Sequence, residues 1–167
     1  FTFLESAAEG TELNIKNSSK NIFFIMFALK QIGHVSNNFN SHVECLKLKD
    51  SISEIIIHEE YLEGLKDIEE SRYLHVLFKF HLCENEYDLV DDTYKGRQTG
   101  IFASRSIKRP NNIGLTTVQL LERNGNKLKV LGLDALNGSP VLDIKPFNPI
   151  LDFAGQQARA WILSKPP

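Results

Sequence analysis

The dipeptide Asn124-Gly125 lies between two segments rich in strand-forming residues, and it constrains the fold more than any other feature of the sequence. Residues 113–122 before it contain several Thr, Val and Leu side chains, and residues 127–133 after it are again rich in Leu and Val. Asn-Gly readily adopts the positive φ angles of a tight turn between antiparallel strands. The sequence therefore predicts a β-hairpin over this region.

Short segments of the same kind, separated by turns, continue along most of the chain. Further strands are expected at residues 28–35, 53–58, 72–81, 100–106 and 140–144. The nearly continuous apolar run within residues 72–81 predicts a strand that is buried on both faces. Loops are expected at residues 37–41 and 84–98, a second tight turn at Asn137-Gly138, and short helices at residues 59–70 and 153–163.

Many short strands with little helix predict a mainly β fold, either a barrel or a sandwich. The chain has 167 residues, of which 42% are hydrophobic and 24% charged, and this composition is typical of one globular domain. We expect residues 1–26 to be an N-terminal extension without a signal peptide, and residues 27–167 to form the domain. There is no apolar run long enough to span a membrane, and two cysteines are too few for a disulfide framework, so a reducing, cytoplasmic location is expected.

Charge is distributed unevenly along the chain. Residues 1–94 carry 17 Asp and Glu against 8 Lys and Arg, whereas residues 95–167 carry 4 against 11. A basic half attracts phosphate groups, and an acidic half can dock on it in a dimer. The alternative is that the two halves interleave in space and their fields cancel.

A basic segment follows the predicted strand at residues 100–106. Arg105, Lys108 and Arg109 precede Pro110 and an Asn-Asn pair, all of which favour a defined loop. Such a loop can direct guanidinium groups and backbone N–H groups at a carboxylate or a phosphate. The alternative is a solvated basic connection between two strands.

A second segment, residues 132–147, places two carboxylates on either side of the turn at Asn137-Gly138. These are Asp134 and Asp143, and Lys145 follows two residues after Asp143. Residues two apart on a strand face the same side, so Asp143 and Lys145 either line one pocket or form a structural ion pair. A carboxylate near a turn suits a ribose diol or an amine, because it accepts two hydrogen bonds.

Other common sites find little support in the sequence. The only close pairs of potential metal ligands are His42 with Cys45 and His81 with Cys83, and neither has the paired spacing of a zinc site. The G-x-S-x-G elbow of a serine nucleophile, the P-loop and the G-x-G-x-x-G fingerprint are all missing. We therefore expect no metal and no nucleotide fold of those classes.

The two segments together resemble the signature of a known family. Residues 100–115 are similar to G-x-F-A-S/T-R-S-P-x-R-P-N-P-I-G-L, and residues 132–147 to G-L-D-x-L-D-G-T-P-V-L-D-I-K-P-Y. Residues 61–68 resemble E-Y-x-x-G-L-x-D-I-E, followed by a strand that ends in Phe80-His81. These are the motifs of the TrmO (TsaA-like, YaeB) family, and the resemblance covers about residues 28–150.

The resemblance implies a fold, a cofactor and a reaction. Members of the family form a single-sheet β-barrel, act as homodimers and bind S-adenosylmethionine near the dimer interface. They methylate the exocyclic amine nitrogen of threonylcarbamoyl-adenosine, which lies beside the anticodon of certain tRNAs. Matching positions imply cofactor contacts at Phe80, His81, Arg105, Leu115, Asp134, Leu136, Asn137 and Gly138.

The resemblance also suggests how the remaining polar residues act. Arg97, Lys108, Arg109 and Asn111 are the expected tRNA contacts. Asp143 is the candidate to take the proton of the acceptor amine, and Lys145 either holds Asp143 or binds a substrate carboxylate. The alternative is that the proton leaves after transfer and no strong base is needed.

The chain departs from the family pattern at several positions. Asn112 stands where the family has Pro, and Asn137 where it has Asp, although an amide still accepts a hydrogen bond. Residues 37–50 lack the P-x-Q motif of the family's early loop. Two other functions therefore remain open: a noncatalytic member that binds S-adenosylmethionine, a nucleoside or RNA, and an enzyme that methylates a different small substrate.

Overall fold

The computed structural model describes residues 28–41, 50–83, 87–91 and 96–152. The chain divides into two compact units, residues 1–30 and 31–167, and the fold described below is that of the second unit. The predicted helix at residues 153–163 and the His42–Cys45 pair lie outside the described residues.

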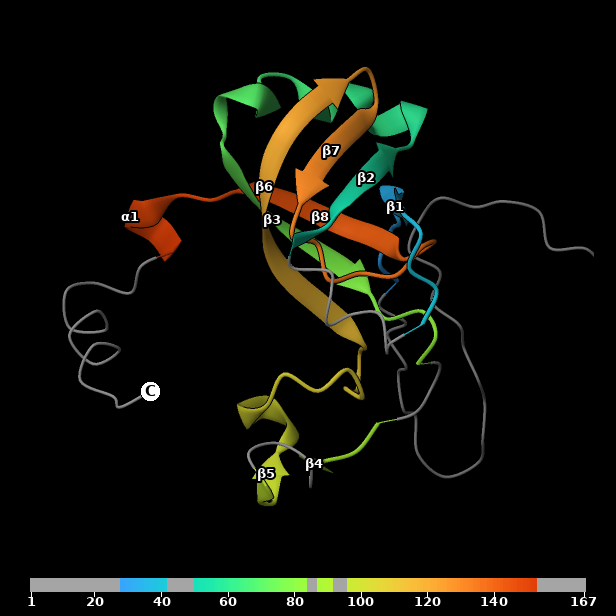
Figure 1. The fold of residues 1–167 in the computed structure, drawn as a ribbon, viewed down its shortest axis with the longest axis vertical. Coiled ribbons are helices and arrows are strands. Elements are labelled where there is room, and N and C mark those ends of the chain that lie inside the picture. Colours follow the sequence, from blue (N-terminus) through green and yellow to red (C-terminus); the bar gives the residue numbers. More distant parts are fainter. Residues whose placement is uncertain (1–27, 42–49, 84–86, 92–95, 153–167) are drawn as a thin grey trace, which may run out of the picture. The chain divides into compact units, whose positions relative to one another are not determined.

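Six antiparallel strands close into a β-barrel (Figure 1). Their order around the barrel is β1-β2-β7-β6-β3-β8, and β8 pairs with β1 to close it. The strands are β1 (Gly33–Ser36), β2 (Ile52–Ile57), β3 (Tyr73–Lys79), β6 (Ile113–Asn124), β7 (Lys127–Leu131) and β8 (Pro140–Pro146). The prediction of a mainly β fold is confirmed, and the barrel is the correct one of the two architectures.

The predicted hairpin is present as β6 and β7. Asn124 pairs with Lys127 across the turn, and Gly125 has the positive φ of 60° that the turn requires. The pairing with β7 covers only the second half of β6, from Gln119 to Asn124, and its register shifts between Leu120 and Glu122. The first half of β6 pairs with β3 alone, as part of a ladder that runs from Ile113 to Gln119.

The core lies inside the barrel and consists of alternate residues from every strand. β3 shows the pattern clearly, because Leu74, Val76 and Phe78 are fully buried while the residues between them face outward. The expectation that β3 is buried on both faces was therefore wrong, since its outward-facing residues are only partly buried or exposed. Val35, Ile55, Ile57, Val118, Leu128, Val130 and Val141 complete the interior from the other strands.

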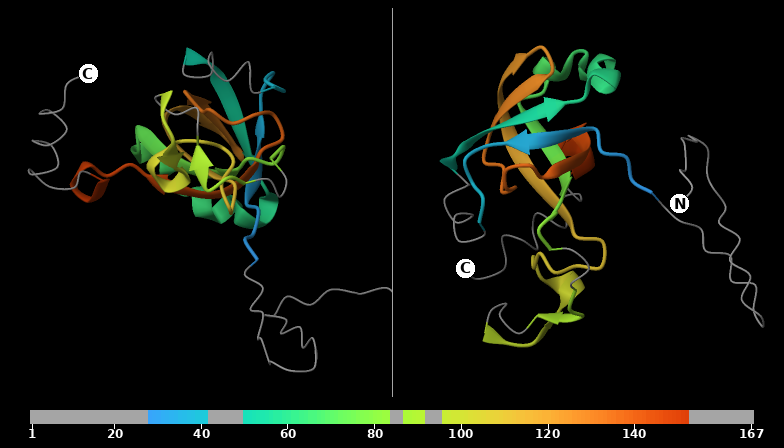
Figure 2. Two further views of the ribbon diagram at one scale, coloured as in Figure 1. Left: turned by 90° about the horizontal axis from the view of Figure 1, so that it is seen from below. Right: turned by 90° about the vertical axis from the view of Figure 1, so that its right-hand side faces the viewer.

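Short elements connect the strands. The helical prediction at residues 59–70 is confirmed as two 3₁₀ helices, η2 (Glu59–Leu65) and η3 (Ile68–Glu70). The predicted loop at residues 84–98 contains β4 (Val90–Asp91), which pairs with β5 (Thr99–Gly100) just after the loop in a separate two-stranded ribbon, and β5 is followed by the 3₁₀ helix η5 (Ile101–Ala103). Figure 2 shows this ribbon and the barrel from two further sides.

Two strand predictions differ from the structure in a way that has a local cause. Residues 100–106 form only the end of β5 and then η5, because Ser104 bonds back to the Ile101 carbonyl through both its N–H and its hydroxyl. The first strand begins at Gly33 rather than at residue 28. A side chain at Gly33 would have its Cβ only 2.4 Å from the carbonyl oxygen of Ile56.

The C-terminal part of β8 is followed by a single helical turn, α1 (Pro149–Asp152). His75, on the outer face of β3, contacts this segment through two groups. Its Nε2 lies 3.2 Å from an Asp152 carboxylate oxygen, and its ring packs edge-on against Phe147 at 5.4 Å. The Nδ1 atom of His75 is 2.9 Å from the Thr117 hydroxyl, which connects this contact to β6.

Gly114 of β6 lies directly against the ring of Phe78 on β3. A Cβ at this position would approach three ring carbons of Phe78 at 2.5 to 2.9 Å, well inside van der Waals contact. Gly114 and Phe78 are register partners, so neither backbone can move away without breaking the ladder. The glycine therefore allows a large aromatic side chain to fill this end of the barrel.

We predict that Gly114→Ala lowers the free energy of unfolding by about 1 to 3 kcal/mol, the usual cost of overpacking a core. Gly100→Ala is the matched control, because its Cβ would meet no atom within 4 Å and its φ is −57°. Urea denaturation measures both. Equal stability of the two variants would show that Phe78 can move aside without cost.

Candidate functional site

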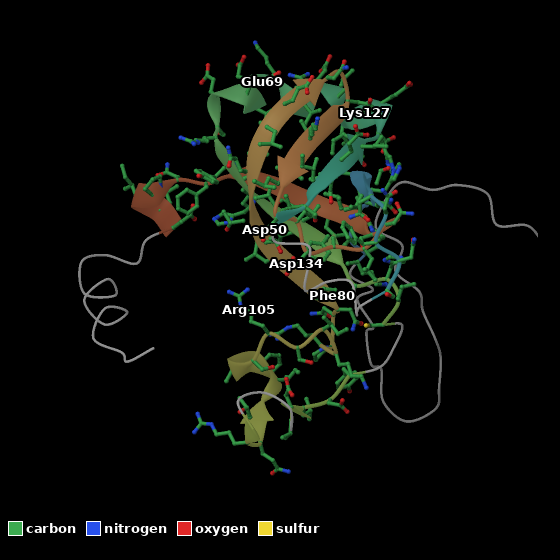
Figure 3. All side chains as sticks on the ribbon, in the orientation of Figure 1. Asp50, Glu69, Phe80, Arg105, Lys127 and Asp134 are labelled. Carbon is green, nitrogen blue, oxygen red and sulfur yellow. The ribbon has the colours of Figure 1, made fainter. Side chains whose placement is uncertain are left out.

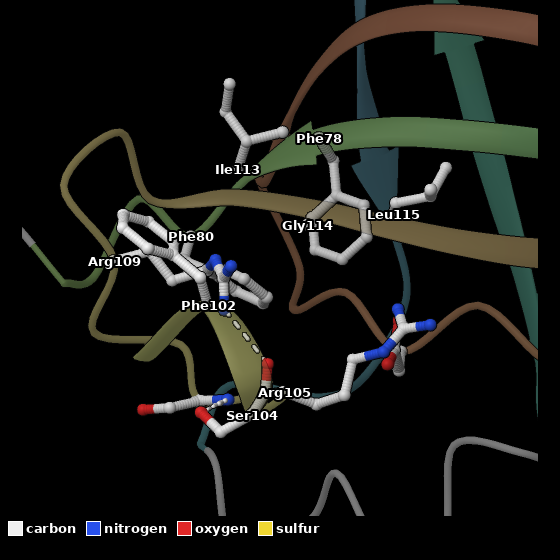
Figure 4. Close-up of a pocket in the computed structure, with 11 residues that line it drawn as sticks. Phe78, Phe80, Phe102, Ser104, Arg105, Arg109, Ile113, Gly114 and Leu115 are labelled. Carbon is white, nitrogen blue, oxygen red and sulfur yellow. Dashed lines mark hydrogen bonds between the residues drawn. The ribbon is translucent and has the colours of Figure 1, made fainter. Parts of the chain in front are cut away.

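A cavity of about 610 Å³ lies where the loop after η5 meets the end of β3 and the start of β6 (Figure 4). Aromatic and apolar side chains form much of its wall, and three charged side chains stand in it. Its lining is Phe78, Phe80, Phe102, Ser104, Arg105, Ser106, Arg109, Ile113, Gly114, Leu115 and Asp134. The two signature segments, distant in sequence, therefore meet in one cavity.

Arg109 holds the loop that forms one wall of this cavity. Its guanidinium donates a hydrogen bond to the carbonyl oxygen of Ile101 at 2.9 Å. It donates another to the carbonyl oxygen of Ser104 at 3.1 Å, which Figure 4 shows. The same group lies 5.8 Å from the centre of the Phe102 ring. Because both hydrogen bonds go to the backbone, Arg109 fixes the shape of η5 and the position of Phe102.

Asn112 connects this loop to the barrel. It has a φ of 48°, and its carbonyl accepts a hydrogen bond of 2.8 Å from the N–H of Phe80. Asparagine tolerates this left-handed conformation better than most residues, whereas proline fixes φ near −65°. The Pro-to-Asn departure from the family pattern therefore corresponds to a backbone conformation that proline cannot adopt.

Arg105 and Asp134 line the cavity with exposed charged side chains (Figure 3). The Arg105 side chain is exposed, and no hydrogen bond or ion pair of its guanidinium is found within the described residues. Asp134 accepts a hydrogen bond from the Thr116 hydroxyl through Oδ1. Leu133 and Ala135, on either side of Asp134, are buried in the core and hold its exposed side chain at the cavity.

The remaining predicted cofactor residues form a neighbouring group, which does not line this cavity. His81 Nδ1 lies 3.2 Å from the Ser139 hydroxyl, which places His81 at the predicted turn. Gly138 has a φ of 77°, as expected for a tight turn, and Leu136 is buried. Of the eight predicted contacts, the cavity brings together Phe80, Arg105, Leu115 and Asp134.

Asn37, which belongs to none of the predicted site residues, holds this turn in place. Its side-chain amide donates to the Ala135 carbonyl and to the Ser53 hydroxyl, both at 3.0 Å. Its backbone N–H donates to Oδ1 of Asn137 at 3.2 Å. Asn137 thus accepts a hydrogen bond through its amide oxygen, as a carboxylate would, and a pair of loop asparagines was the only signal in the sequence.

Asp143 and Lys145 lie together on the outer face of β8, and neither lines the cavity. The Lys145 ammonium lies 2.7 Å from an Asp143 carboxylate oxygen. A hydrogen bond to Asp143 and its negative charge raise the pKa of Lys145, so the lysine stays protonated and is no base at neutral pH. Their predicted catalytic role stays a prediction.

The residues predicted to contact tRNA differ in what they contact here. Arg97 and Asn111 are exposed, and Lys108 forms a long ion pair with Asp88 at 3.8 Å. Arg109 is engaged with the loop backbone, as described above. Within the described residues there is no group of three or more potential metal ligands. The described part of the chain also has no helix that is both long and apolar enough to cross a membrane.

Comparison with known families identifies the class of this domain. Residues 36–153 match the model of the tRNA-methyltransferase O N-terminal domain. The match includes the last residue of β1, all the other strands of the barrel and both signature segments. The chain therefore belongs to this family, as the sequence motifs indicated.

The curated relatives include proteins of different lengths. A "Probable S-adenosyl-L-methionine-binding protein" of Archaeoglobus fulgidus is 39% identical over 82% of this chain but only 38% of its own length. A second A. fulgidus protein, named "S-adenosyl-L-methionine-binding protein", is 40% identical over 77% of this chain and 94% of its own length. The rat "tRNA (adenine(37)-N6)-methyltransferase" is 34% identical over 68% of this chain and 25% of its own length.

Solved structures show the same barrel. The crystal structure of TrmO from Pseudomonas aeruginosa superposes with a TM-score of 0.63 at 29% identity. The superposition covers 85% of this chain and 65% of that one. The chain thus spans less than two thirds of that structure and of several relatives.

We predict that Arg109→Ala lowers both the midpoint of thermal unfolding and the affinity for S-adenosylmethionine. The loss of two hydrogen bonds from a charged group to the backbone costs about 1.5 to 3 kcal/mol each. Arg97→Ala, which removes an exposed arginine from the same basic half, is the control and leaves both quantities unchanged. Thermal denaturation and calorimetric titration are the measurements, and an Arg109→Ala protein with unchanged values of both would contradict the role in the loop.

Proposed function

We propose that this domain binds S-adenosylmethionine in the cavity of about 610 Å³ and transfers its methyl group to an adenosine of tRNA. Membership of the family and the printed names of the relatives support this function. The specific acceptor that we propose is the exocyclic nitrogen of threonylcarbamoyl-adenosine. The observation that carries the proposal is the Arg105 guanidinium, which is without a protein partner in the described structure and stands in a cavity with aromatic walls.

The residues of the cavity match the parts of S-adenosylmethionine. Arg105 offers a guanidinium fork to the carboxylate of the methionine part. Phe80 and Phe102 present aromatic faces for the adenine, and the Phe102 side chain is 78% exposed. Asp134 provides a carboxylate for an ammonium or a ribose hydroxyl. The turn at residues 136–138, with His81 beside it, is the further contact that the family motif suggests.

When bound, S-adenosylmethionine supplies a methyl group on a positively charged sulfur, which an amine nitrogen can attack. The domain mainly has to hold two reactants in line and exclude water. The Arg109 hydrogen bonds and the Gly114–Phe78 contact give the cavity its fixed walls. A negative charge at Asp134 favours the positive charge that the sulfonium brings into the cavity.

A noncatalytic binding module is the second candidate, and two observations favour it. The related A. fulgidus protein of similar length is named for binding S-adenosylmethionine, without a stated reaction. The missing P-x-Q motif points in the same direction. Both candidates share the cofactor site, and they differ in whether a methyl group reaches tRNA. The homodimer and the cytoplasmic location stay predictions.

We predict that Arg105→Ala weakens the affinity for S-adenosylmethionine about 10- to 100-fold, which corresponds to loss of a charge-assisted hydrogen bond. Lys66→Ala is the matched control, because Lys66 is an exposed cation that does not line this cavity. Calorimetric titration with S-adenosylmethionine and with S-adenosylhomocysteine measures the change.

The outcomes separate the possibilities. Equal affinity of the folded Arg105→Ala and Lys66→Ala proteins would place the cofactor elsewhere. Binding by the wild-type protein together with methylation of tRNA that carries threonylcarbamoyl-adenosine supports the enzyme. Binding without transfer to any tRNA supports the noncatalytic module.

A further inference from the structure

A second cavity, of about 380 Å³, opens on the outer face of the barrel next to the first. Its lining is Tyr73, Thr116, Thr117, Gln119, Leu131, Gly132 and Asp134. Asp134 is the residue common to both cavities. Its carboxylate, labelled in Figure 3, therefore stands at the boundary between them.

The second cavity exists because β7 separates from β6 at Gly132. Leu131 is the last residue of β7, and Gly132 has a φ of 90° that turns the chain away. The Gly132 N–H then donates a hydrogen bond of 3.0 Å to the Ser51 carbonyl. Two residues later, the Asp134 carboxylate accepts a hydrogen bond from the Thr116 hydroxyl of β6. The space between these two attachment points is the cavity.

Its floor is a row of outward-facing residues on three neighbouring strands. Tyr73 pairs with Gln119, and Gln119 pairs with Leu131, so the three side chains lie side by side. Tyr73 is 41% exposed. For the Gln119 amide no hydrogen bond is found among the described residues, so its donor and its acceptor both face the cavity unpaired.

A cation stands next to this row. The Arg72 guanidinium lies 5.8 Å from the centre of the Tyr73 ring, and Arg72 is exposed. An exposed aromatic ring, an amide with both hydrogen-bonding functions and an adjacent arginine are the components of sites for single-stranded nucleotides. The ring takes the face of a base, the amide its edge, and the arginine a phosphate.

We propose that this second cavity is the acceptor subsite, which takes a purine base of single-stranded RNA. The inference rests on the proposed function, because it identifies where the acceptor of that reaction binds. Tyr73 stacks on the base, and the Gln119 amide N–H donates to a ring nitrogen at the purine edge, which leaves the single hydrogen of the substituted exocyclic nitrogen for the transfer step. The common wall at Asp134 brings the base next to the cofactor cavity.

The position of Asp134 also assigns it a part in the transfer. The nitrogen lone pair forms the new N–C bond, the electrons of the S–C bond go to sulfur, and the nitrogen proton must leave. Oδ1 of Asp134 accepts from Thr116, so Oδ2 remains to take this proton. The cationic sulfur becomes a neutral thioether, and Asp134 becomes neutral as the proton arrives.

The test uses the full chain saturated with S-adenosylhomocysteine, so that added nucleoside cannot enter the first cavity. Adenosine 5′-monophosphate is then titrated while amide NMR signals are followed. The account predicts shifts at Gln119, Leu131 and Gly132. Tyr73→Ala should weaken this binding on the order of tenfold, through loss of a stacked aromatic ring. Gln119→Ala should reduce the preference for adenosine over cytidine monophosphate.

Tyr87→Ala and Gln98→Ala are matched controls, because both are exposed residues of the same types and line neither cavity. Shifts confined to other surfaces, or equal effects of the Tyr73 and Tyr87 variants, would overturn the subsite while S-adenosylhomocysteine still binds. Failure of S-adenosylhomocysteine to bind the wild-type protein would overturn the proposed function, and the subsite with it. In transfer assays, the account predicts a higher KM for tRNA in Tyr73→Ala with an unchanged cofactor affinity.

Discussion

Both cavities depend on where β6 stops pairing with β7. Only Gln119–Asn124 of β6 have partners on β7, so the first half of this long strand borders other parts of the chain. On that half, Gly114 gives room to Phe78 at one cavity, and Thr116 binds Asp134 at the boundary with the other. A complete ladder would leave no place for Asp134 beside β6.

The polar residues around the site have two distinct roles. Arg109 and Asn112 donate side-chain hydrogen bonds to backbone carbonyls, and Asn37 donates to the Ala135 carbonyl and the Ser53 hydroxyl, and these bonds give the loops their shapes. Arg105 and Gln119 point into the cavities without such partners in the described structure. The residues that bond to the backbone hold the cavity walls in place, and Arg105 and Gln119 are available to bind a ligand. The Asp143–Lys145 pair on the outer face of β8 stands apart from both cavities.

Local turn chemistry explains which parts of the fold could be predicted from the sequence. Asn124-Gly125 and Asn137-Gly138 specify positive φ angles within two residues, and both turns are present. The segment after Gly100 has a strand-like composition, but its conformation depends on Ser104 and on Arg109, eight residues after Ile101. The burial of β3 was overestimated, because an apolar pattern does not tell whether a second layer is present.

The candidate site likewise contains residues that could be predicted from the sequence and residues that could not. Arg105 and Asp134 were identified through family motifs, and the structure brings them into one cavity. The bond from Asn37 to Ala135 spans 98 residues, and the row of Tyr73, Gln119 and Leu131 needs the register of three strands. Neither leaves a local trace in the sequence. The assignment of Arg109 to tRNA was made from its charge, whereas its hydrogen bonds show a contribution to loop structure.

The most direct test of the account is an amide NMR titration of the wild-type protein with S-adenosylhomocysteine alone. The account predicts that the largest shifts fall on Ser104 to Ser106, Gly114, Leu115 and Asp134, which line the first cavity from both signature segments. Shifts that cluster away from these residues, or saturation without any shift in either segment, would contradict the central claim that this cavity holds the methyl donor.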